Sequence, residues 1–99
     1  MLYVIVGRDA PGSLDLRQRV RPQHLERMKV LMAEHRLTLA GPCPVDDAPT
    51  PGPGGISGSV IIAEFPSLDE ARRWIAADPY VTEGVFESVE VRPFIKALP

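Results

Sequence analysis

The chain has 99 residues, of which 44% are hydrophobic and 24% charged, which is an ordinary globular composition and a suitable size for one domain spanning residues 1–99. Its formal net charge of −2 lacks the basic excess that binding to a phosphate backbone needs, so no nucleic-acid partner is expected. No apolar stretch approaches the roughly 20 residues of a transmembrane helix, and residues 1–6 lack the basic start and cleavage site of a signal peptide. We therefore expect a cytoplasmic protein with no membrane partner.

The first part of the chain predicts a strand, a helix and a second strand. Residues 2–7 (LYVIVG) form an apolar, β-rich run that ends at a glycine. Pro22 favours the first turn of a helix, so we expect a helix to begin near this residue and to run to about His35. Its apolar face would hold Leu25, Met28, Leu31 and Met32. A short alternating strand is predicted at residues 37–40.

Residues 41–58 stand apart in composition. The chain has 11 prolines and 8 glycines, and this segment holds five of each. Such a segment cannot be a helix or an interior strand, so we predict a loop over residues 41–58. Long loops inside small domains tend to be functional or disordered. A strand at residues 59–65 (SVIIAEF) is expected to follow.

The last third of the chain predicts a second helix and a final strand. Ser67 and Glu70 have the spacing of a capping box, and Pro79 should end the helix at or before Asp78. Residues 88–94 alternate between apolar and charged side chains, as a strand does. The order strand–helix–strand–strand–helix–strand indicates a ferredoxin-like α+β fold, βαββαβ, with both helices on one face of a four-stranded sheet.

Two of the predicted strands are apolar on both sides. In residues 2–6 and 60–63, both alternating sets of side chains are apolar. A sheet with one solvated face should alternate apolar and polar residues, and a bare apolar face exceeds the patch that a soluble monomer normally exposes. We therefore expect a homodimer in which a second copy covers this face, as in a dimeric α/β barrel.

The order of the elements brings three polar residues to one end of the sheet. The start of the first helix, the 41–58 loop, the start of the 59–65 strand and the end of the second helix should gather there. His24, Ser59 and Asp78 lie on those element ends.

His24 and Asp78 are the candidate catalytic residues. In the first turn of a helix, His24 would meet the positive end of the helix dipole, which disfavours imidazolium and leaves a neutral ring that can act as a general base. Asp78, at the end of the other helix, could pair with that ring, fix its tautomer and stabilise the imidazolium. The alternatives are an ordinary helix-surface histidine and a turn-forming Asp-Pro.

Other polar residues also have a functional and a structural interpretation. Arg17, Arg19 and Arg21 could steer an anionic substrate or form a solvated charge run. Ser59 could bind substrate or simply open a strand, and His35 is expected to cap the far end of the first helix. Because there are only two histidines, a single cysteine and no carboxylate cluster around them, we expect neither a metal site nor an intrachain disulfide.

Six segments are distinctive in combination. They are LYVIVG (2–7), SLDLRQRVRPQHL (13–25), AGP (40–42), GSVIIAEF (58–65), ADPYV with the following GVFE (77–87), and VRPF (91–94). Together they resemble the YCII-like family of small bacterial proteins over essentially the whole chain. The resemblance implies a ferredoxin-like fold that dimerises into an α/β barrel, related to muconolactone isomerases and small cofactor-free monooxygenases. It also implies an active-site His and Asp, which map onto His24 and Asp78, and some members are linked to dehydrochlorination of chlorinated hydroxyquinones.

Three functions remain as alternatives. The first is a small-molecule enzyme in which His24 is the general acid/base, Asp78 orients it, and Arg21 and Ser59 bind an acidic cyclic substrate. Its reaction would be an isomerisation or an elimination and would need no cofactor. The second is a non-catalytic ligand-binding or accessory module, and the third is a cofactor-free monooxygenase.

Overall fold

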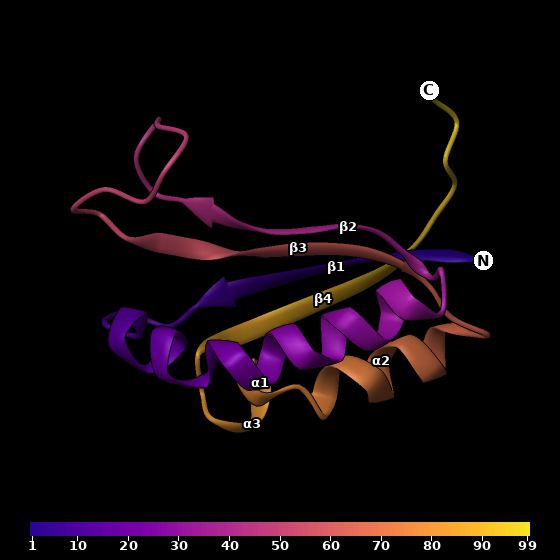
Figure 1. Cartoon of the computed structure of the whole chain (residues 1–99), viewed down its shortest axis with the longest axis horizontal. Helices are drawn as coiled ribbons and strands as arrows, with labels where there is room; N and C mark the ends of the chain where they lie inside the picture. The colour runs from indigo at the N-terminus through magenta and orange to yellow at the C-terminus, as the bar shows by residue number, and fades with distance from the viewer.

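Helices α1 (Leu14–Ala33) and α2 (Leu68–Ala76) pack on the same face of a four-stranded sheet (Figure 1). The computed structural model describes residues 1–99. The remaining elements are β1 (Leu2–Asp9), β2 (Leu37–Pro44), β3 (Ile56–Glu64), α3 (Pro79–Thr82) and β4 (Phe86–Phe94). The strands lie in the order β2-β3-β1-β4, and all neighbours are antiparallel. The predicted ferredoxin-like α+β fold is confirmed, with the short α3 added before the last strand.

Helix α1 is longer than the sequence predicts, because it begins at Leu14 and holds Pro22 in its interior. We expected the start near Pro22, since an interior proline lacks an amide and clashes with the preceding turn, at a cost of ~3 kcal/mol. Tertiary contacts hold the turns before the proline in place. Leu16 and Val20 pack against the core, and the buried Arg17 bonds to groups on β1 and β3.

The buried face of α1 also differs from the predicted apolar face. Met28 and Leu31 are buried as expected, but Met32 is 60% exposed. Arg17 and His24 join the buried side instead. Polar side chains therefore face the sheet between Arg17 and His24, whereas the sequence predicts Arg17 to lie before the start of this helix.

The end of α1 is capped by the backbone around His35. This residue has a positive φ of 57°, and its amide donates to the carbonyl of Met32. The amide of Arg36 donates to the carbonyl of Leu31, which completes a Schellman-type cap. His35 thus caps the helix as predicted, although its backbone makes these bonds.

The strands beside the Pro/Gly-rich segment extend further than predicted. β2 continues to Pro44 and β3 begins at Ile56, so the predicted 41–58 loop is wrong at both ends and only residues 45–55 connect the strands. β2 is an edge strand, where proline is tolerated because alternate amides point away from the ladder. The connection projects beyond the sheet, at the end where α1 begins (Figure 1).

The region after β3 follows the prediction up to Asp78. The amide of Glu70 donates to Ser67 Oγ at 3.1 Å, as the capping-box spacing implied, and α2 ends at Ala76. Asp78 does not close this helix, however. It is the N-cap of α3, because Pro79 is well suited to the first position of a new helix. β4 then begins at Phe86, two residues earlier than expected.

The core lies between the helices and the inner face of the sheet, where Tyr3, Ile5 and Ile61 are buried. On the outer face, alternate apolar residues are only half-buried; they include Val4, Val6, Val60 and Ile62. The prediction of two apolar sheet faces is therefore confirmed. None of the helices has the length and apolarity that crossing a bilayer requires.

Candidate functional site

A cavity of about 390 Å³ lies between α1 and the inner faces of β2 and β3, and Tyr80 of α3 contributes to its wall. Its polar side chains are Arg17, Gln18, Arg21, His24, Ser59 and Tyr80. Pro51 also lines it, so the connection between β2 and β3 borders the site. The end of the sheet that the element order singled out is therefore hollow.

His24 and Asp78 meet beside this cavity. His24 Nδ1 lies 2.9 Å from Asp78 Oδ1 and 3.1 Å from Oδ2. Both side chains are buried, with 8% and 0% of their surfaces exposed. The proximity predicted from the order of the elements is confirmed, but the predicted effects of the helix dipoles on the two residues are wrong. His24 lies in the middle of α1 and Asp78 begins α3, so neither residue is at the helix end that the dipole argument assumed.

Three donors hold the Asp78 carboxylate. Besides His24, the amide of Tyr80 donates to Oδ1 at 2.9 Å and Arg27 Nη1 donates to Oδ2 at 3.0 Å. Burial by itself would raise the pKa of Asp78, but the hydrogen bonds from these three groups and the charge of His24 outweigh it and hold the pKa below its ordinary value of 3.8. The carboxylate is therefore ionised at neutral pH.

The geometry of the pair leaves one nitrogen of His24 available. Nδ1 faces a carboxylate that can only accept, so it carries the proton of the neutral ring, and Nε2 carries the lone pair. No fully buried side-chain nitrogen or oxygen in the structure lacks a hydrogen-bond partner. Because Nε2 has no partner, it is not fully buried, and His24 lines the cavity. Nε2 is therefore accessible to a ligand.

Arg17 and Ser59 form a second polar pair in the cavity. Arg17 is bound in bidentate fashion by Asp9, with Nε–Oδ2 and Nη2–Oδ1 distances of 2.8 and 2.9 Å. Arg17 Nη2 also donates to Ser59 Oγ at 2.8 Å. Since the serine oxygen accepts this bond, its hydroxyl proton is free to be donated. Ser59 lies in the cavity as expected, but Arg17 has a fixed place there that the sequence did not indicate.

The ring of Tyr80 stacks on His24, with centroids 4.0 Å apart and planes at 13°. Burial raises the pKa of the Tyr80 hydroxyl above its ordinary value of 10.0, although the charges of Arg17 and Arg21 oppose the shift. Sequence reasoning missed Tyr80 and Arg27. Their only signals were positional: Tyr80 follows Asp78 by two residues, and Arg27 lies three residues after His24 on α1.

The remaining candidates are placed differently. Arg21 lines the cavity, whereas Arg19 is exposed and does not. His35 lies at the other end of α1. No group of three or more His, Cys, Asp or Glu side chains is arranged to hold a metal ion.

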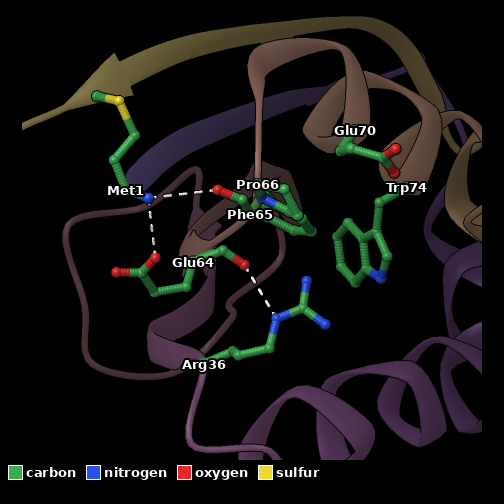
Figure 2. Close-up of a pocket in the computed structure, with 7 residues that line it drawn as sticks. All are labelled: Met1, Arg36, Glu64, Phe65, Pro66, Glu70 and Trp74. Atoms are coloured by element: carbon green, nitrogen blue, oxygen red, sulfur yellow. Dashed lines mark hydrogen bonds and ion pairs between the residues drawn. The ribbon is translucent and has the colours of Figure 1, made fainter.

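A larger hollow of about 740 Å³ lies at the opposite end of the sheet, around Phe65 and Trp74 (Figure 2). Its cations are already paired. The amino group of Met1 lies 3.0 Å from a Glu64 carboxylate oxygen, and Arg36 bonds to the Glu64 carbonyl and to a carboxylate outside the hollow. No imidazole or hydroxyl group lines it. The smaller cavity is therefore the candidate site.

Residues 1–95 match the model of the YCII-related domain. The chain belongs to this family. Protein YciI of Escherichia coli O6:H1 is 52% identical over 96 residues, covering 97% of this chain and 98% of the relative. An uncharacterized protein of Haemophilus influenzae is 49% identical over the same shares of the two chains.

Among solved structures, this member of the YCII-related family is similar to 5-chloro-2-hydroxyhydroquinone dehydrochlorinase (TftG) from Burkholderia phenoliruptrix AC1100 in complex with 2,5-dihydroxybenzoquinone. The two chains are 29% identical, the match covers 96% of this chain and 94% of that one, and the TM-score is 0.84. The likeness in fold thus extends to a protein that binds a small hydroxylated ring.

Proposed function

We propose that the chain is an enzyme that moves a proton on a small cyclic substrate without a cofactor, in an isomerisation or an elimination such as dehydrochlorination. The observation that carries this proposal is the buried His24–Asp78 pair, which opens into a cavity that also holds Arg17 and Ser59. The similarity to a dehydrochlorinase supports the elimination in particular.

His24 acts as the general base in this scheme. Nε2 removes a proton from a hydroxyl or an acidic C–H of the substrate, and the Asp78 carboxylate stabilises the resulting imidazolium through Nδ1. The electron pair left behind collects on a substrate oxygen. In an isomerisation the imidazolium returns the proton to another carbon, whereas in an elimination the electron pair forms a double bond and expels the leaving group as an anion.

Arg17 and Ser59 stabilise the oxygen on which negative charge develops. Both groups are donors fixed in advance, because Asp9 holds Arg17 and Arg17 in turn holds Ser59 Oγ. Donors that need no rearrangement at the moment of reaction are effective, and removing one typically costs roughly 10²–10³ in kcat. Arg21 lines the same cavity.

Turnover of a panel of chlorinated hydroxyquinols, followed by chloride release, tests this proposal. His24→Ala should lower turnover by at least about 10²-fold, while His35→Gln on the same helix should have no effect. Turnover that survives His24→Ala contradicts the role of the base. Oxygen uptake during the reaction would indicate a monooxygenase instead, and binding of the panel without any turnover would indicate a ligand-binding module.

We also propose that a second copy of the chain covers the outer face of the sheet. Val4, Val6, Val60 and Ile62 leave an apolar centre on this face, and Glu90 and Arg92 share its β4 side, since they pair with Val6 and Val4. An apolar centre with charged residues at its side is the usual composition of a protein–protein interface. In a dimer, the cavities would lie on the helix sides, away from the shared face.

A further inference from the structure

Two ion pairs balance the charges of the buried side chains around the cavity. Arg17 is neutralised by Asp9, and 4% and 3% of the two side chains are exposed. Arg27 balances Asp78 from outside the cavity wall, at 3.0 Å. Because Arg27 neutralises the Asp78 carboxylate, a neutral His24 leaves no unpaired charge in the buried cluster.

Arg21 has no partner in either of these ion pairs. It follows Arg17 by four residues and precedes His24 by three, so all three lie on the same face of α1. Arg21 takes part in none of the ion pairs or side-chain hydrogen bonds of the structure, whereas its neighbours Arg17 and Arg27 take part in several. Its positive charge nevertheless acts inside the site, because it opposes the rise that burial causes in the pKa of the Tyr80 hydroxyl.

The rest of the cavity wall offers Arg21 no counter-charge. No Asp or Glu lines the cavity, and the wall opposite α1 is made of residues such as Ala40, Pro42, Ile56 and Ile61. Arg21 is solvent-exposed, so it brings to the rim of the cavity a positive charge that no carboxylate of the cavity wall balances. At about 390 Å³ the cavity is also near the lower end of the range for ligand pockets, which suits a single substituted ring.

We infer that the cavity selects ring compounds that carry one negative charge at rest, with the anionic group bound by Arg21 and the reacting part of the ring directed to His24 and Ser59. The inference rests on the proposed function, because it takes this cavity as the substrate site. It adds the charge class of the substrate and makes Arg21 the residue that determines it. Arg17 serves a different purpose, since its charge is already compensated by Asp9.

Benzoate and benzamide are suitable probes, because they have the same shape and differ by one charge. Titration of each into the protein at pH 8, where an ordinary imidazole is neutral, is followed by ¹⁵N–¹H NMR shifts of cavity residues. The wild type should bind benzoate about tenfold more tightly than benzamide, as expected for a hydrogen-bonded ion contact. Arg21→Gln should lose this preference and keep its affinity for benzamide.

Arg19→Gln is the matched control, because Arg19 lies on the same helix outside the cavity and its loss should leave the preference intact. The inference is overturned if the wild type binds the two probes equally or not at all, or if Arg21→Gln keeps the preference for benzoate. All of these outcomes are binding measurements and do not depend on turnover. The two proposals can fail separately. If the wild type shows no turnover but His24→Ala still prefers benzoate to benzamide, the proposed reaction fails and this inference stands.

Discussion

Replacing Arg27 by methionine tests how the buried carboxylate of Asp78 is kept charged. Arg27 donates to Asp78 at 3.0 Å and to the Trp74 carbonyl at 2.7 Å, and its guanidinium lies 4.4 Å from the centre of the Trp74 ring. Methionine keeps an unbranched apolar stem but loses the charge and both hydrogen bonds. His24 and the Tyr80 amide remain as partners of the carboxylate.

The cost follows from these contacts. A hydrogen bond to a charged group contributes about 1.5–3 kcal/mol, and a cation–π contact at a partly exposed site adds about 0.5–1 kcal/mol. Removing one partner of a fully buried ion pair costs about 3–5 kcal/mol. Since 25% of the Arg27 side chain is exposed and two donors stay on Asp78, we expect the free energy of unfolding to fall by about 2–4 kcal/mol.

Urea unfolding at pH 7 and fixed protein concentration, followed by far-ultraviolet circular dichroism, measures this loss. Arg73→Met is the matched control, because Arg73 pairs with Glu70 on the surface of α2, and exposed pairs contribute at most about 1 kcal/mol. Equal losses in the two variants would refute the claim that Arg27 compensates a buried charge.

The difference between wild type and Arg27→Met should also depend on pH. A carboxyl whose folded-state pKa is lowered, as for Asp78, stabilises the fold fully above its unfolded pKa and loses this effect as pH falls through the folded value. The difference should therefore be constant above about pH 5 and shrink below the ordinary value of 3.8. A difference that does not change down to pH 2 would contradict an electrostatic origin.

Three further predictions concern the fold and its assembly. Gly58→Ala places a Cβ against a backbone carbonyl of β1, whereas Gly41→Ala meets nothing within 4 Å, so only the former should lose about 2 kcal/mol or more in urea unfolding. Asp9→Asn leaves a buried guanidinium without its carboxylate and should cost about 3 kcal/mol in the same assay; a change below about 1 kcal/mol would show that the pair is not a buried ion pair. Val60→Lys on the outer face should convert a dimer to a monomer in sedimentation velocity, while Thr82→Lys should not, and a wild type that sediments as a monomer when dilute would refute the dimer.

The meeting of His24 and Asp78 could be predicted from the order of the elements, because strand and helix directions alone place their segments at one end of the sheet. The reasons given for their chemistry did not hold, since they depended on helix boundaries. Pro22 marked a helix start by local preference, but buried contacts of Arg17 extend α1 to Leu14. Local sequence does not contain those contacts.

The partners of Asp78 show the same limit. Pro79 correctly marked the end of α2, yet the short α3 that it begins makes Asp78 an N-cap and directs Tyr80 onto the His24 ring. Arg27 was indistinguishable from other surface charges of α1 until its position relative to Trp74 was known. Side chains that act through distant partners are identified only once the helices are packed.

Proline also determines how the sheet can associate. The two outermost strands hold Pro42 and Pro44 in β2 and Pro93 in β4, and the ladder is irregular between Cys43 and Pro44. Each proline removes an amide that an incoming strand would need, so neither margin is a good template for edge-to-edge addition. The prolines of these two strands thus disfavour open-ended β-aggregation through the sheet edges, and the proposed dimer would instead use the outer face of the sheet, which can be covered only once.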